Sequence, residues 1–373
     1  MFESIEIENY KKIRKIKIED FKQFNLIVGK NNSGKTSILE AIFYSINPGN
    51  PTLTIQAVGQ VKISLDKSAK EAMFWEPFFH RLDTGREVKL SSKLIKPSFE
   101  ERILTIVPMY EAQPDSEINN LIKMNGQDYY AAKIQKLVIG LIYNFSIKKD
   151  NAEVKSHQST IEYKKLEPVT VYPGMKVQPF NVKSDPSYKL TTNGRLINPR
   201  NLYSNLDGKY GQILLKKQEK QVINYMKIID SELEDIILVG DQIYLDLGED
   251  FISRLPISFW GEGTSKAFAI LLDLINLPNS IILIDEIENG LHYSTMEIFF
   301  DFIFKVARSL NIQLFMTTHS YECVRAISNS ISKLDEEDDF RLYRIESKDD
   351  KLKSIKYSFR EISTSIEQEW EIR

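Results

Sequence analysis

Residues 29–36 read GKNNSGKT, in which a lysine and a threonine follow the second of two glycines. This order fits the phosphate-binding loop GxxxxGK followed by Ser or Thr, whose backbone N–H groups surround phosphate oxygens at the start of a helix. Lys35 is expected to reach the β and γ phosphates, and the Thr36 hydroxyl to bind Mg²⁺. The pattern therefore predicts a site for ATP and Mg²⁺ with these nucleotide-binding residues: Gly29, Asn31, Asn32, Ser33, Gly34, Lys35, Thr36 and Ser37.

Two further groups of polar residues follow apolar runs. The run IILIDE at 281–286 ends in Asp285, expected to bind the metal, and Glu286, a candidate general base for the attacking water. The run MTTHS at 316–320 places His319 just past another apolar run. Because the carboxyl ends of parallel strands share one edge of a sheet, His319 is expected beside the acidic pair, as a sensor of the γ-phosphate.

The run SFWGEGTSKAFAILL at 258–272 begins a predicted helix in an unusual way. Gly261 and Gly263 stand at its start with Ser258 ahead of them. Glycine there sacrifices chain entropy and packs no side chain, so the bare backbone must serve another purpose. Phosphate approaching a helix N-terminus is one such purpose.

Together these motifs resemble those of ABC-type ATPases of the RecF, SMC and OLD kind. In that group a Ser-x-Gly-x-Gly signature leads a helix, precedes the acidic strand, and binds the γ-phosphate of ATP held by the other subunit. Ser258, Gly261 and Gly263 resemble that signature, with Trp260 as an extra residue relative to the simplest spacing. The resemblance implies a homodimer with nucleotide between its subunits.

Other stretches carry the same resemblance over residues 1–48 and 250–373. IENYKKI resembles the strand before the phosphate loop, ENGLH at 288–292 resembles the loop that crosses the dimer interface, and RLYRI with the final EIR resembles the tail of compact OLD-like ATPases. The family also has a glutamine after the first helix that helps to hold Mg²⁺ and water. Gln56 and Gln60 are both candidates for it.

The order of predicted elements indicates an α/β fold. Apolar alternation predicts strand, loop and helix up to Pro48, and helices alternate with strands after Pro256. This order indicates a sheet covered by helices on both faces. The resemblance implies a P-loop NTPase fold of the ABC-ATPase type, with a mixed sheet flanked by helices. Residues 1–48 and 250–373 are expected to form the ATPase domain around an insertion, 49–249, comprising an antiparallel β subdomain and a helical, lid-like segment. One helix is expected between residues 211 and 235, with apolar residues on one face: Leu215, Val222, Met226, Ile229 and Leu233.

Composition excludes some classes of protein. Apolar residues make up 42% of the 373 residues and charged residues 27%, which is typical of a globular protein. A net charge of −3 gives no overall basic footprint for nucleic acid, although KKIRKIKI at 11–18 could form a local basic face. The single cysteine, Cys323, and the lack of an apolar signal or a membrane-length run favour a cytoplasmic protein with no membrane contact.

Two functions remain open at this stage. The first is a dimeric ATPase that hydrolyses ATP to gate or drive a separate effector, a nuclease or toxin in bacteriophage defence, since we expect no room for a Toprim nuclease domain after the sheet. The alternative is a RecF-like, ATP-dependent DNA clamp in repair, which salt-sensitive DNA binding would reveal. A transporter subunit is disfavoured by the N-terminal strands and the β-rich insertion.

Overall fold

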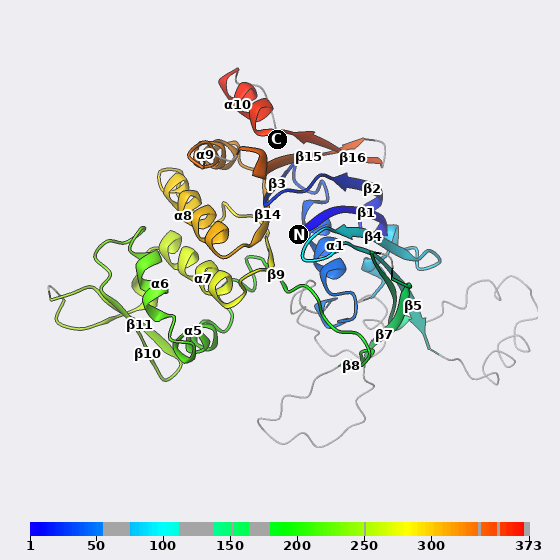
Figure 1. The fold of residues 1–373 in the computed structure, drawn as a ribbon, viewed down its shortest axis with the longest axis horizontal. Helices are drawn as coiled ribbons and strands as arrows, with labels where there is room; N and C mark the ends of the chain where they lie inside the picture. The colour runs from blue at the N-terminus through cyan, green and yellow to red at the C-terminus, as the bar shows by residue number, and fades with distance from the viewer. Residues whose placement is uncertain are drawn as a thin grey trace, which may run out of the picture.

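The computed structural model describes residues 1–54, 75–111, 138–150, 152–163, 180–249, 251–334, 337–348 and 351–368. A six-stranded sheet lies at the centre of this described part (Figure 1). Its order is β16 (Lys351–Tyr357), β15 (Phe340–Lys348), β3 (Phe24–Val28), β14 (Gln313–Thr318), β13 (Ile281–Ile284) and β9 (Gly194–Ile197). All neighbouring pairs are parallel except β15 with β16, so the sheet is mixed, as predicted.

A second, antiparallel sheet lies beside the first. Its order is β2 (Ile13–Glu19), β1 (Phe2–Tyr10), β4 (Val88–Leu94), β5 (Glu100–Tyr110), β6 (Val138–Lys149), β7 (Lys155–Tyr163) and β8 (Phe180–Lys183). Alternate side chains of β6 are buried, which is the pattern of a sheet with one face on a core: Leu141, Tyr143, Phe145 and Ile147.

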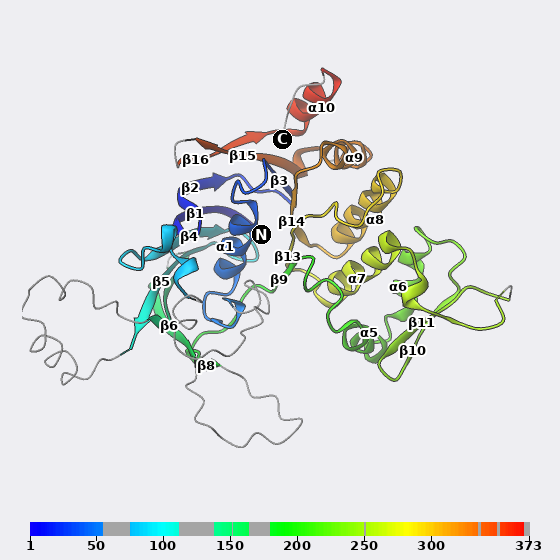
Figure 2. The ribbon, with the colours of Figure 1, turned by 180° about the vertical axis from the view of Figure 1, so that it is seen from behind.

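The central sheet is covered on both faces (Figures 1 and 2). Helix α1 (Lys35–Ile46) and the antiparallel sheet cover one face, where Ile27, Leu283 and Phe315 belong to their core. Helices α7 (Glu262–Asn276), α8 (Met296–Ser309) and α9 (Tyr321–Ser332) cover the other, where the neighbouring residues of the same strands point. This arrangement explains why these strands are apolar at every position.

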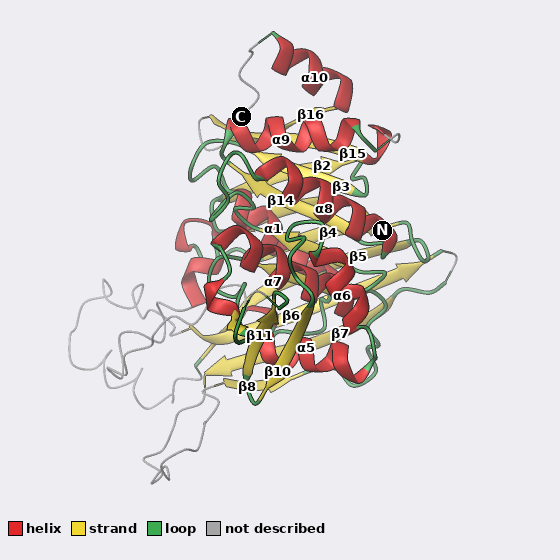
Figure 3. Cartoon of the chain, turned by 90° about the vertical axis from the view of Figure 1, so that its left-hand side faces the viewer, coloured by secondary structure: helices red, strands yellow, loops and turns green. Residues whose placement is uncertain are grey.

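A small outer unit packs on α7 and differs from the prediction (Figure 3). The helix expected between 211 and 235 is two helices, α5 (Leu206–Leu215) and α6 (Glu219–Met226). Lys217 has a left-handed backbone, with φ of 57°, which ends α5, and Leu215 is 86% exposed rather than buried. A three-stranded sheet follows, with β10 (Asp235–Val239), β11 (Gln242–Asp246) and β12 (Leu255–Pro256).

The sheets divide the chain differently from the expected boundaries at 49 and 249. Strands β1 and β2 belong to the antiparallel sheet, and β9, from within the expected insertion, forms an edge of the central sheet. Both ends of the chain do meet in the central sheet, since β3 pairs with β14 and β15. The remaining described elements are α10 (Phe359–Glu367) and the short 3₁₀ turns η1 (Glu76–Phe78), η2 (His80–Leu82), η4 (Ile257–Phe259) and η5 (Glu337–Asp339). Among the described residues, no helix combines the length and apolar character needed to cross a membrane.

Candidate functional site

The phosphate loop connects β3 to α1, as the sequence predicts. Gly29 and Gly34 have φ of 151° and 95°, and a Cβ on Gly29 would lie 2.7 Å from the Ile345 carbonyl oxygen. Only glycine fits there without strain. Lys35 is buried, and its Nζ donates to the carbonyl oxygens of Gly29 at 2.7 Å and Lys30 at 3.1 Å. Burial lowers the pKa of Lys35, and the nearby carboxylate of Asp285 opposes that shift.

A hydroxyl and a carboxylate meet at the carboxyl edge of the central sheet. Thr36 Oγ1, at the start of α1, donates to Asp285 Oδ2 at 2.8 Å. Thr317 Oγ1, near the end of β14, donates to Asp285 Oδ1 at 2.5 Å. Burial raises the pKa of Asp285, while these two hydrogen bonds lower it. The two motifs are therefore in direct contact, although 249 residues separate Thr36 from Asp285.

Glu286 follows Asp285 in a strained backbone conformation. Its φ is 51°, in the left-handed region that non-glycine residues rarely adopt. Its N–H donates to Thr317 Oγ1 at 2.8 Å, and its Oε2 accepts from Asn289 Nδ2 at 2.6 Å. These bonds hold the side chain at the sheet edge, a geometry that suits a base acting on water.

His319 lies at the same edge and contacts a carboxylate. Its Nδ1 lies 2.9 Å from Glu288 Oε1, which also accepts the His319 backbone N–H at 2.9 Å. The imidazole is 45% exposed, whereas the Glu288 side chain is 7% exposed. The histidine is thus oriented by a buried carboxylate and still open to a ligand.

The turn with Ser258, Gly261 and Gly263 leads α7, on the sheet face opposite α1. Ser258 lies exposed in η4, and Gly261 precedes the first residue of α7. Gly261 has an ordinary φ of −57°, and a Cβ added to it would meet nothing within 4 Å. Nothing in the described part of this chain therefore requires glycine at 261. Gly263 lies close to the Leu291 side chain, at 3.6 Å from its would-be Cβ.

The remaining predicted site residues belong to the phosphate loop, to α1 or to the stretch of sequence after α1. Asn31 and Asn32 are exposed on the phosphate loop, and Ser37 is buried in α1. Gln56 and Gln60, the two candidates for the family glutamine, lie outside the described residues.

Sequence reasoning missed Thr317 and Lys266. Thr317 lies in the MTTHS run, and a threonine beside a predicted strand end is the only signal that the sequence offers for it. Lys266 is a lone cation within the apolar face of α7, and that contrast was its signal.

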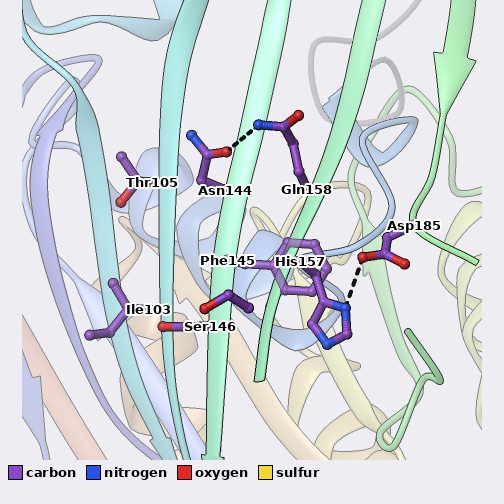
Figure 4. A pocket seen from close by; sticks show the side chains of 9 residues that line it. Ile103, Thr105, Asn144, Phe145, Ser146, His157, Gln158 and Asp185 are labelled. Atoms are coloured by element: carbon purple, nitrogen blue, oxygen red, sulfur yellow. Dashed lines mark hydrogen bonds and ion pairs between the residues drawn. The ribbon is translucent and has the colours of Figure 1, made fainter. Parts of the chain in front are cut away.

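A groove of about 470 Å³ lies elsewhere, across β5, β6 and β7 (Figure 4). Within it, His157 Nδ1 lies 2.9 Å from Asp185 Oδ2 and 3.1 Å from Ser187 Oγ. A Ser-His-Asp triad requires serine and carboxylate on different ring nitrogens, so this group is not one. The groove contains none of the predicted site residues.

The residues present fit a nucleotide and Mg²⁺. No side chain caps the N-terminus of α1, and the buried Ser33 hydroxyl has no hydrogen-bond partner among the described residues. Both features suit an anion at the loop. Thr36 and Asp285 offer only oxygen ligands, which Mg²⁺ prefers, and it is usually bound by one or two carboxylates together with substrate phosphates.

Comparisons with known proteins find ATPase domains along the sequence. Residues 1–170 match a family model described as an AAA ATPase domain, and residues 145–325 match one described as an AAA domain, putative AbiEii toxin, type IV TA system. The chain is 26% identical over 355 residues to a Helicobacter pylori protein named ATP/GTP phosphatase, with 90% of each chain covered.

Two solved structures are similar over nearly the whole chain. An SMC head bound to the C-terminal winged-helix domain of ScpA has a TM-score of 0.49 and 10% identity, covering 96% of this chain and 98% of that chain. The SMC head domain from Thermotoga maritima has a TM-score of 0.43 and 11% identity, covering 96% and 99%. Identities this low say nothing about function.

The fold, the phosphate loop and the sequence matches define an ATPase of the P-loop class. Both matching family models describe AAA domains, and the chain hydrolyses ATP.

Proposed function

We propose that two copies of this chain bind two Mg²⁺–ATP molecules between them, and that hydrolysis of this ATP gates a separate effector protein. Each site would combine the phosphate loop of one copy with the Ser258–Gly261–Gly263 turn of the other. The observation that carries the proposal is the contact between Thr36 and Asp285, which joins the phosphate loop to the acidic strand.

Each side chain then has a role that its position supports. Lys35 would exchange its bonds with loop carbonyls for phosphate oxygens. Thr36 and Asp285 would hold Mg²⁺, which when bound neutralises charge on the phosphates. Glu286 would accept the proton of the attacking water, and His319, oriented by Glu288, would contact the γ-phosphate.

The shared site is supported by the placement of α1 and α7. They cover opposite faces of the central sheet, which favours a signature turn that serves another copy. The open space beside Gly261 supports the same conclusion. Phe259 and Tyr293, close in sequence to the turn and to the following loop, are 73% and 71% exposed, as expected of residues that a partner covers.

The effector is proposed from the family description, which names a putative toxin of a type IV system. We infer a nuclease or toxin acting in bacteriophage defence. The DNA-clamp alternative is weakened because two of the three basic residues of β2 are paired: Lys15 Nζ lies 2.7 Å from Glu6 Oε1, and Lys17 Nζ lies 2.6 Å from Glu19 Oε1. Tight, salt-sensitive DNA binding that requires ATP would favour the clamp instead.

Mixing two inactive variants tests the shared site. Lys35→Ala should abolish ATP binding, and Ser258→Arg should leave ATP binding by the single copy intact while abolishing hydrolysis. A mixed dimer keeps one complete site, so mixtures should recover part of the wild-type ATPase rate. Mixtures that stay inactive after proven subunit exchange would refute the shared site.

A further inference from the structure

The side chain of Lys266 links α7, the helix that follows the signature turn, to the loop at residues 287–291, which follows Glu286. It lies on α7, is 4% exposed, and its Nζ donates to the carbonyl oxygens of Ile287 and Asn289, each at 2.6 Å. Burial lowers the pKa of Lys266 to about 8, while the nearby Glu288 carboxylate opposes that shift. A buried ammonium is costly, so this position is maintained by its two hydrogen bonds.

The loop that Lys266 contacts orients both reacting groups of the same subunit. Asn289 donates to Glu286 Oε2 at 2.6 Å, and Glu288 binds His319 at 2.9 Å. The loop is bent through left-handed backbone conformations at Glu286 and Gly290, with φ of 51° and 75°. Strained segments of this kind persist only where surrounding contacts hold them, and Lys266 supplies two such contacts.

The turn itself also contacts this loop. A Cβ on Gly290 would lie 2.5 Å from Glu262 Oε1, so the Glu262 side chain covers that glycine. Gly263 lies against Leu291. Movement of the turn would therefore be transmitted to residues 287–291. Of the three residues Glu262, Gly263 and Lys266 that contact this loop, Lys266 makes the charge-assisted hydrogen bonds.

We propose that Lys266 is a positioning residue that couples the two ATP sites of the dimer. The turn at the start of α7 would contact the neighbour's nucleotide, whereas Glu286 and His319 act on the subunit's own. Lys266 would thus convey occupancy of one site to the chemical groups of the other. This inference rests on the proposed shared-site dimer.

The test compares hydrolysis per intact site in dimers with two usable sites and in dimers with one. Mixing wild type with excess Lys35→Ala gives dimers in which the wild-type subunit holds ATP but its own signature turn meets none. In the wild type, the rate per site should be at least about fivefold higher with both sites usable, the lower end of ordinary coupling between sites. In the Lys266→Met background the two rates should agree within twofold.

Lys209→Met is the matched control. Lys209 is also buried against α7, at 8% exposure, and its Nζ donates to Asp273 Oδ2 at 2.9 Å, away from the loop. Loss of a buried lysine from this core should therefore affect stability in both variants, but Lys209→Met should keep the wild-type ratio of rates. If Lys266→Met does not fold, Lys266→Gln, which keeps an N–H donor, should show an intermediate ratio.

The outcomes separate the two proposals. A wild-type ratio in both Lys266→Met and Lys266→Gln overturns the coupling role while leaving the shared site intact. A ratio of rates near one in Lys209→Met also overturns the coupling role of Lys266, because the loss of any buried lysine next to α7 would then be enough to abolish the coupling. Mixed dimers without activity in every background would instead contradict the shared site.

Discussion

At the residue scale, Thr317 organises the catalytic edge. One hydroxyl donates to Asp285 Oδ1 at 2.5 Å and accepts the Glu286 N–H at 2.8 Å. It thus orients the proposed metal ligand and the proposed base together. Groups that orient a metal ligand from behind contribute strongly to metal affinity, even though they do not touch the metal.

We predict that Thr317→Val lowers the apparent Mg²⁺ affinity about 10- to 100-fold, the usual effect of losing such a group. Valine keeps the shape of threonine but leaves Asp285 Oδ1 and the Glu286 N–H without the Thr317 hydroxyl. The measurement is the Mg²⁺ concentration that gives half-maximal ATPase activity. Thr317→Ser retains the hydroxyl and should stay near wild type. An unchanged Mg²⁺ requirement in Thr317→Val would show that Thr317 does not position Asp285.

The sequence predicted the site residues that follow strands, but it did not predict the residues that hold them in place, Thr317 and Lys266. Asp285, Glu286 and His319 follow apolar runs, so the shared edge of a parallel sheet places them together. Thr317 and Lys266 act through contacts with segments 31 and 21 residues away, and nothing in a local pattern reports such contacts. In the sequence, Lys266 is marked only as the one cation of a mostly apolar helix.

At the element scale, a helix-ending backbone motif separates α5 from α6. Its left-handed position is occupied by a lysine, Lys217. Lys217 N–H donates to the Leu214 carbonyl and Gln218 N–H to the Ile213 carbonyl, both at 3.0 Å. This pair of bonds is the Schellman motif, whose left-handed position is usually glycine. Lys217 adopts that position with φ of 57°.

We therefore predict that Lys217→Gly stabilises the protein by about 0.5 to 1 kcal/mol, because glycine adopts the left-handed region without the strain of a side chain. Lys217 is exposed, so little packing is lost. Urea denaturation followed by tryptophan fluorescence gives the change in free energy of unfolding, and Lys216→Gly at the preceding position, which is right-handed, should destabilise instead. A loss of stability in Lys217→Gly would mean that the α5–α6 break does not depend on this residue.

The apolar period of residues 211–235 suggested one helix because Val222, Met226 and Leu233 are indeed buried. Apolar periodicity indicates which residues face a core. It does not indicate that a non-glycine residue, here Lys217, adopts a left-handed conformation and ends the helix. Strand pairing is equally hidden, because Ile197 of β9 pairs with Ile284 of β13, 87 positions further along the chain, and no local pattern specifies that pairing.

At the scale of the whole molecule, the central sheet separates the two parts that we propose complete an ATP site in a dimer. The face with α1 and the antiparallel sheet carries the phosphate loop, and the face with α7, α8 and α9 carries the signature turn (Figures 1 and 2). The carboxyl edge joins them through Asp285, Glu286 and His319. In the proposed dimer, the phosphate loop and the Ser258–Gly261–Gly263 turn of one copy would therefore serve two different ATP sites.

The most direct test of this account is the assembly of Glu286→Gln with ATP. Glutamine keeps the shape of the side chain but cannot accept the proton, so hydrolysis should slow by about 10²-fold or more. Asp285 and Lys35 are unchanged, so ATP should still bind and hold two copies together. In size-exclusion chromatography with light scattering, we predict a long-lived dimer with ATP and a monomer without it, against a faster-exchanging dimer for the wild type. A variant that hydrolyses ATP at the wild-type rate, or one that binds ATP and remains monomeric, would contradict the account.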